Sequence, residues 1–213
     1  MVSEARRGTR GVGTLHGEGR RSGAAGGKTR TASSRRAKIA DAAPYARGFP
    51  PVAAPTAEVL ILGSLPGEMS IAMQQYYAQP RNAFWRIMGE VCGAEPALPY
   101  AKRLERLKAA RIALWDVLAA GERRGSLDSA IVPATMVVND FASFFAAHPG
   151  IRFVSFNGTK AAELYRRHVL PTLPPDVAAL ESRRLPSTSP ANASYSFERK
   201  LELWTAALRD RLC

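Results

Sequence analysis

The sequence is poor in cysteine and histidine, and this scarcity excludes several kinds of site. Its 213 residues include only two cysteines, Cys92 and Cys213, which are too few for a disulfide framework or for a cluster held by cysteine thiolates. The three histidines, His16, His148 and His168, are scattered without the spacing of metal ligands. We therefore expect a site that uses no metal and no cofactor.

Long apolar runs are also missing. No apolar run approaches the roughly 18 residues of a membrane-spanning helix, and the N-terminal residues lack the apolar core of a secretory signal. We therefore expect no contact with a membrane. The Arg- and Ser-rich start overlaps in composition with organelle transit peptides, so organelle targeting by this segment stays open on the sequence alone.

Acidic residues are scarce in the first fifty positions. Residues 1–50 hold 11 Lys and Arg against three acidic residues, a net charge of +8, whereas the rest of the chain has a net charge of +4. This segment has almost no aromatic or branched apolar residues, so it cannot bury enough surface to offset the entropy of ordering. We expect a basic, disordered tail, either a solubilising segment or one attracted to phosphate backbones. Residues 51–213 should form the one folded domain.

Short apolar runs alternate with helical patterns along residues 51–213. Strands are predicted at 58–63, 111–118, 151–156 and, more weakly, within 177–187. Helices are predicted at 83–93, at 139–150 with a cap at Asn139 or Asp140, at 159–168 with a cap at Thr159, and at the C-terminus. The C-terminal helix carries an apolar stripe made of Phe197, Leu201, Trp204, Leu208 and Leu212. This alternation predicts an α/β fold, a three-layer α/β/α sandwich around a short, mostly parallel four-stranded sheet.

Three polar or glycine-rich segments follow the predicted strands. They are "GSLPG" (63–67), "FNG" (156–158) and "LPSTSPANA" (185–193). Because ligands bind beyond the carboxyl ends of parallel strands, we expect these segments to converge at one edge of the sheet. Each also has a purely structural interpretation, as a strand-to-helix turn, an Asn-Gly turn and an elaborate helix entrance respectively. The first segment lacks the Lys and the spacing of a P-loop, which argues against nucleotide hydrolysis.

The stretch "YYAQPRNAFW" (76–85) leaves the role of Asn82 open. Asn is a favoured helix N-cap and an apolar helical pattern follows this residue, so capping is the simplest interpretation. Tyr76 and Tyr77 could likewise be ordinary core aromatics. A plain core helix, however, has no use for Gln-Pro-Arg-Asn at its entrance, which favours a second role for the segment.

Together these motifs resemble the uracil-DNA glycosylase superfamily. The resemblance is closest to its hypoxanthine (deoxyinosine) DNA glycosylase branch, next to the mismatch-specific uracil/thymine glycosylases. "LGSLPG" (62–67) is similar to the first superfamily motif and "LPSTSPANA" to the second, while "YYAQPRNAFW" and "FVSFNGTKA" (153–161) match segments between them. "ALWDVL" (113–118) with "GSLDSAI" (125–131) also matches the region between the two motifs. The resemblance covers about residues 57–210. Two residues depart from the pattern, because Ser64 stands where related branches carry Asn or Asp, and Gln79 stands where His is usual.

The resemblance implies a monofunctional DNA glycosylase of base-excision repair. Such an enzyme would hydrolyse the N-glycosidic bond of a flipped-out deaminated base, hypoxanthine in preference and uracil as an alternative, and leave an abasic site. Its partner would be double-stranded or single-stranded DNA that contains these bases. We expect a monomer in the cytoplasm, associated with the nucleoid. The alternative is a catalytically silent nucleic-acid-binding module with a glycosylase fold.

The resemblance also implies roles for individual residues. Asn82 takes the catalytic role together with Ser64, and its neutral amide orients a water because it cannot accept a proton. The residues expected to bind the base are Gly63, Leu65, Pro66, Gly67, Tyr77, Phe156 and Asn157. Those expected to bind DNA are Pro186, Ser187, Thr188, Ser189 and Asn192. Glu68 and Asp116 are rival carboxylates, although a solvated loop residue and a structural hydrogen-bond acceptor are their simpler interpretations.

Overall fold

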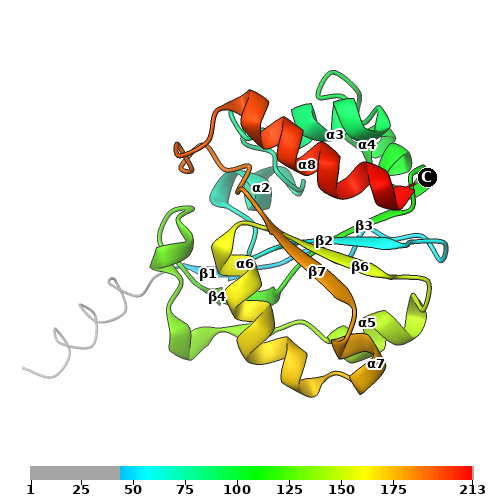
Figure 1. The fold of residues 1–213 in the computed structure, drawn as a ribbon. Coiled ribbons are helices and arrows are strands. Elements are labelled where there is room, and N and C mark those ends of the chain that lie inside the picture. The colour runs from blue at the N-terminus through cyan, green and yellow to red at the C-terminus, as the bar shows by residue number, and fades with distance from the viewer. Residues whose placement is uncertain (1–43, 213) are drawn as a thin grey trace, which may run out of the picture. The chain divides into compact units, whose positions relative to one another are not determined.

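A four-stranded parallel sheet forms the centre of the protein (Figure 1). The structure is a computed structural model that describes residues 44–212, so most of the expected tail lies outside the described residues. The strands are β2 (Val59–Gly63), β3 (Ile112–Asp116), β6 (Phe153–Asn157) and β7 (Glu181–Leu185), arranged in the order β3-β2-β6-β7. All three neighbouring pairs are parallel, which confirms the predicted sheet.

Burial along the strands follows their place in the sheet. Every residue of β2, β3 and β6 is buried, as expected for the near-continuous apolar runs of inner strands that are covered on both faces. The edge strand β7 instead exposes its first four residues, which are polar or charged, and buries only Leu185. Charged side chains on an edge strand also discourage pairing with other chains.

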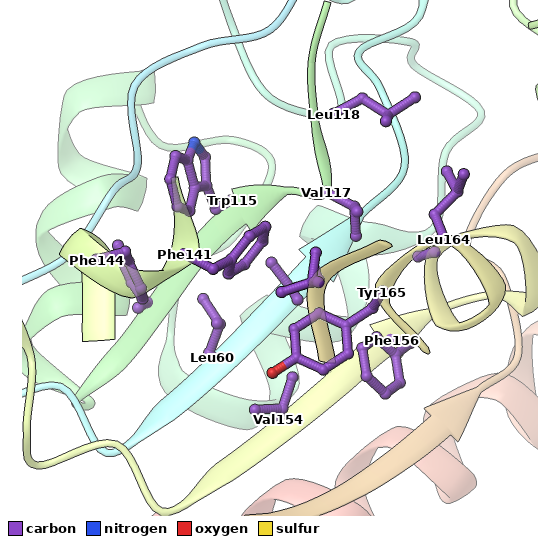
Figure 2. Close-up of a cluster of buried hydrophobic side chains, with 14 of the residues drawn as sticks. Leu60, Trp115, Val117, Leu118, Phe141, Phe144, Val154, Phe156, Leu164 and Tyr165 are labelled. Carbon is purple, nitrogen blue, oxygen red and sulfur yellow. The ribbon is translucent and has the colours of Figure 1, made fainter. Parts of the chain in front are cut away.

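Helices cover both faces of this sheet, which confirms the three-layer sandwich (Figure 1). One face carries α3 (Phe84–Cys92), α4 (Tyr100–Ala109) and α8 (Phe197–Leu212), and the other carries α5 (Phe141–Ala147), α6 (Thr159–Leu164) and α7 (Pro175–Ala178). Alternate residues of β2 enter the two apolar cores, with Val59 and Ile61 on the α8 side and Leu60 and Leu62 on the α5 side. Figure 2 shows the core on the α5 side, where Leu60 lies near Phe141 and Val154 lies near Tyr165.

A second, antiparallel sheet was not predicted. It consists of β1 (Tyr45–Arg47), β4 (Leu118–Glu122) and β5 (Val137–Val138) in the order β1-β4-β5. The predicted strand 111–118 therefore ends at Asp116, and Leu118 already belongs to the next strand. The expected boundary at residue 50 also falls too late, because β1 pairs with β4 in an antiparallel register. Strands this short carry too little periodicity to be recognised in a sequence.

Two helix caps were expected from the sequence. The structure decides between the two candidates for the cap of α5 and shows that the expected cap of α6 is wrong. Asp140 caps α5, where its side chain accepts a hydrogen bond from the Ser143 amide at 3.0 Å. The cap of α6 is Gly158 and not Thr159. Gly158 has φ of 101°, and a Cβ there would lie 2.9 Å from the Cβ of Ser187, so only glycine lets the two loops approach. Further short elements are α2 (Glu68–Met73), a π-helical turn at Tyr165–Val169, and 3₁₀ turns at Asp128–Ala130, Pro133–Thr135 and Leu170–Thr172.

Candidate active site

A cavity of about 600 Å³ lies at the carboxyl ends of β2, β3 and β6. The three polar segments found in the sequence meet there, as parallel strands require. Most of the residues that the sequence singles out line it, namely Gly63, Ser64, Leu65, Pro66, Gly67, Tyr77, Asn82, Asn157, Ser187, Thr188, Ser189 and Asn192. Asp116 and Gln79 line it as well.

Two of the singled-out residues lie elsewhere. Phe156 is buried in the apolar core on the α5 side, and it lines a second cavity of about 500 Å³ between β6, β7, α6 and α7. Because side chains alternate along a strand, Phe156 must face away from the cavity that its neighbour Asn157 lines. Pro186 is not part of the cavity wall either, and its carbonyl accepts a hydrogen bond from the indole of Trp204 at 2.9 Å.

The first-motif loop, residues 63–67, is held by its carbonyl groups. The Ser64 carbonyl accepts from the Leu118 amide at 3.0 Å. The guanidinium of Arg123 donates from Nη1 to the Leu65 carbonyl at 3.2 Å and from Nη2 to the Pro66 carbonyl. Arg123 is only 2% exposed, so this cation is buried beneath the loop. Sequence reasoning missed Arg123, which lies far along the chain and outside any recognised motif.

Thr188 joins three parts of the site. Its hydroxyl accepts a hydrogen bond from Nδ2 of Asn157 at 2.8 Å, and its amide donates to Oδ1 of the same side chain at 2.8 Å. Its carbonyl accepts from the Ala83 amide at 3.0 Å. Thr188 is 1% exposed, so water does not compete for these bonds. The second-motif loop is thereby fixed both to the end of β6 and to the segment that carries Asn82.

Asn82 lines the cavity and also takes part in the entrance of α3. Its Oδ1 accepts a hydrogen bond from the Phe84 amide at 3.0 Å, although the residue at the N-cap position is Ala83. Asn82 is therefore not the N-cap that the sequence suggests, although its side chain accepts from the amide of the first helical residue. The side-chain amide has two N–H groups that this bond does not use. One residue can thus close the helix end and present a neutral donor to a ligand.

Tyr77 forms an aromatic wall of the cavity. Its ring stacks on Phe84 with centroids 4.0 Å apart and an interplanar angle of 23°. The residue has φ of 52°, an unusual left-handed conformation for tyrosine that turns its side chain toward the strand ends. Burial, reinforced by the negative charge of Asp116, raises the pKa of Tyr77.

Two carboxyl groups lie on the wall near Ser64. The Ser64 hydroxyl donates to Oδ1 of Asp128 at 2.5 Å, so this residue of the first motif is bonded to a carboxyl group from another loop. Asp116 is 4% exposed. Burial, and next the charge of Asp128, raise the pKa of Asp116 from 3.8 to about 7, while Arg123 opposes the shift. The pKa of Asp128 is raised as well, chiefly by burial.

Side-chain hydrogen bonds, one of them from a buried lysine on α8, hold the second-motif loop. Asn192 donates from Nδ2 to the Ser187 carbonyl at 3.1 Å, and Nζ of Lys200 donates to the Asn192 carbonyl at 2.8 Å. Lys200 is 5% exposed, and burial lowers its pKa. Glu68, the other rival carboxylate, does not line the cavity but accepts a hydrogen bond from the Gly125 amide at 2.9 Å.

Exposed apolar side chains stand among the residues that line the cavity. Leu127 is 57% exposed and Met69 is 45% exposed, and both belong to its lining. Large exposed apolar groups beside a polar cavity indicate a surface that meets a partner.

Among residues 44–212 no three His, Cys, Asp or Glu side chains come together as a metal site. Within the same range, no helix combines the length and apolar character needed to cross a membrane.

The fold and the site define a class of protein, an α/β/α sandwich with a polar set of side chains at the carboxyl edge of its sheet. The sequence pattern of the Uracil DNA glycosylase superfamily matches residues 50–211, and the chain belongs to this family. It is therefore a DNA glycosylase, an enzyme that hydrolyses N-glycosyl bonds.

Relatives of this chain support the same assignment. A hypoxanthine DNA glycosylase of Methanosarcina acetivorans is 43% identical over 164 residues, which cover 76% of this chain and 98% of that protein. A hypoxanthine DNA glycosylase of Methanosarcina barkeri is 44% identical over 118 residues, which cover 55% of this chain and 73% of that protein. A solution NMR structure of a candidate uracil DNA glycosylase from M. acetivorans superposes with a TM-score of 0.65 at 43% identity, covering 78% of this chain and 98% of that one.

Replacing Asp116 by Asn should stabilise the protein more at pH 8 than at pH 5. The pKa of Asp116 is raised from 3.8 to about 7 in the folded state, so between these values the folded protein holds a proton that the unfolded chain has released. The stability of the wild type therefore falls as the pH rises through this range, by on the order of a few kcal/mol at most. Urea unfolding at both pH values measures the difference. A stability difference between Asp116→Asn and the wild type that is the same at pH 5 and pH 8 would contradict the raised pKa of Asp116.

Proposed function

We propose that this DNA glycosylase excises hypoxanthine from DNA, with uracil as a lesser substrate, and leaves an abasic site. The observation that carries the proposal is the presence of the Asn82 carboxamide on the same cavity wall as the first-motif loop and Asn157. The M. acetivorans and M. barkeri relatives named as hypoxanthine DNA glycosylases support the choice of base. Both a purine and a pyrimidine are small enough for a cavity of about 600 Å³.

The target base must leave the duplex before it can enter this cavity. Extrusion costs a few kcal/mol, and less where the base is mispaired, which by itself favours deaminated bases. Inside the cavity Tyr77 stacks on the flipped base. One face of the Tyr77 ring contacts Phe84, and the opposite face is the one that contacts the base. Asn157 reads the Watson–Crick edge, because its bonds to Thr188 leave one N–H and one lone pair of the amide free to pair.

Breaking the glycosidic bond places negative charge on the departing base and positive charge on the sugar. The backbone N–H groups of Ser64, Leu65 and Gly67 stabilise the charge on the base, as in an oxyanion hole, while the loop carbonyls stay bonded to Arg123 and Leu118. Asn82 orients the water that attacks C1′, and a neutral amide does so without taking its proton. Ser187, Ser189 and Asn192 hold the adjacent phosphate through neutral donors.

Asn82→Ala should lower the rate of hypoxanthine excision by about 100-fold or more, because the attacking water loses its positioning donor. The assay uses duplexes that contain deoxyinosine, deoxyuridine or deoxyxanthosine, with alkali to cleave the abasic product. Asn82→Ser is the matched control, since serine can still cap the helix entrance but has no carboxamide. We expect both variants to show this loss of rate and the serine variant to keep more of the stability. Full activity of Asn82→Ser would show that Asn82 has only a structural role at the helix entrance. A wild type that cleaves none of the duplexes would favour the alternative, a catalytically silent nucleic-acid-binding module.

Leu127→Ala should slow excision from duplex DNA by roughly 10-fold and excision from single strands much less. Leu127 is the most exposed large apolar residue that lines the cavity, and apolar side chains inserted between base steps help to unstack a duplex. A single strand needs no such wedge. Val137→Ala removes another exposed apolar side chain, on β5 and outside the cavity lining, and should have no effect. Equal losses on both forms of DNA would refute the wedge.

A further inference from the structure

Asp116 occupies the floor of the cavity beside the start of the first motif. It is the last residue of β3 and stands in register with Gly63, the last residue of β2. The contact is so close that a Cβ placed on Gly63 would lie 2.2 Å from Oδ1 of Asp116. A side chain at position 63 would therefore displace the carboxyl group. The backbone carbonyl of Asp116 is separately held by Nδ2 of Asn139 at 2.8 Å, which fixes the strand end.

The Asp116 carboxyl lacks a complete set of partners within the protein. Its Oδ2 is buried without a hydrogen-bond partner among residues 44–212. The hydroxyl of Tyr77 lies 3.1 Å from the same Cβ position on Gly63, and a hydrogen bond with the Asn157 side chain lowers its pKa against the effect of burial. A buried polar oxygen without a partner destabilises the folded protein. In a binding cavity, the unpaired Oδ2 of Asp116 therefore indicates a ligand that completes its hydrogen bonds.

The surroundings of Asp116 favour its neutral form near pH 7. Burial is the main cause and the charge of Asp128 the next, and they raise the pKa of Asp116 to about 7 against the opposing charge of Arg123. The titratable and charged groups that interact with Asp116 are Asp128, Arg123, Tyr76, Tyr77 and Tyr100. A neutral carboxyl group is a hydrogen-bond donor as well as an acceptor, and burial is how proteins keep one protonated at neutral pH.

The proposed excision of a purine lacks an acid, and Asp116 is placed to supply it. Asn82 carries no acidic proton near neutral pH. Asp128 already accepts the Ser64 hydroxyl at 2.5 Å. We propose that Asp116 is a further catalytic residue, whose neutral carboxyl group hydrogen-bonds to N7 of the departing hypoxanthine and gives it a proton as the glycosidic bond breaks. This role rests on the proposed function.

The step balances as a hydrolysis. The C1′–N9 bond breaks and its electron pair leaves with the purine, while the proton of Asp116 moves to N7. The oxygen of the water held by Asn82 bonds to C1′, and the proton that this water loses passes through solvent and restores the Asp116 carboxyl. The products are neutral hypoxanthine and an abasic sugar. Uracil has no equivalent of N7 and leaves without this acid, so Asp116 makes the site selective for a purine.

The test compares single-turnover excision of deoxyinosine and 7-deaza-deoxyinosine, which lacks N7, by the full-length wild type and Asp116→Asn. The wild-type rate on deoxyinosine should fall as the pH rises through about 7, because the neutral acid is lost. Asp116→Asn should be slowed about 100-fold on deoxyinosine, with a flat pH profile over this range. The wild type should be slow on 7-deaza-deoxyinosine, and the variant should lose nothing further there.

Matched controls separate chemistry from structure. Asn139→Ala loosens the same strand end without removing the carboxyl, so any loss should be equal on the two substrates. Thermal unfolding of Asp116→Asn verifies that the variant is folded. Equal losses by Asp116→Asn on both substrates, or an unchanged pH profile, would overturn the catalytic role alone. A wild type that excises no base would overturn the proposed function and this role with it.

Discussion

The geometry of the site depends on two hydrogen bonds between Thr188 and Asn157. The second-motif loop has little apolar surface of its own, so packing cannot fix its position. Two hydrogen bonds of 2.8 Å between these buried residues fix it to the end of β6, and a third from Ala83 attaches the entrance of α3. The sheet order β3-β2-β6-β7 places β2 between β3 and β6, so the first-motif loop lies beside both. The side chains proposed to contact substrate therefore come from strand ends and from loops bonded to them.

The chemistry of the site follows from which charges are exposed and which are buried. Ser64 is neutral and its hydroxyl donates to the carboxyl group of Asp128. Arg123 holds the loop carbonyls and offsets the two nearby carboxyl groups, although it lies under the loop and away from solvent. The surface proposed to meet DNA is thus rich in hydroxyls and amides, while the acidic group lies deep, where burial favours its proton. We expect such a site to select for leaving groups that can accept a proton or spread a charge.

The layered fold and most of the cavity wall could be predicted because they depend on local periodicity and strand ends. The apolar run at 58–63 is β2, and the pattern after Ala83 is α3. Phe156 is expected to bind the base because it belongs to the same motif as Asn157, but the structure places it in the apolar core. Adjacent residues of a strand face opposite sides of the sheet. Arg123 and Asp128 were missed because residues 118–138 contain short strands and turns without periodicity. Asp116 was recognised as a carboxylate at the right edge, but only its burial and its unpaired Oδ2 distinguish it from a structural acceptor.

The central claim is that the cavity at the carboxyl ends of β2, β3 and β6 receives an extruded base. The most direct test is a crystal structure of the full-length chain with a duplex that contains 2′-fluoro-2′-deoxyinosine, whose glycosidic bond resists hydrolysis. The account predicts hypoxanthine outside the helix, stacked on Tyr77, bonded to Asn157 and with N7 toward Asp116. A base that stays stacked in the duplex, or DNA bound over the second cavity beside Phe156 and β7, would contradict it.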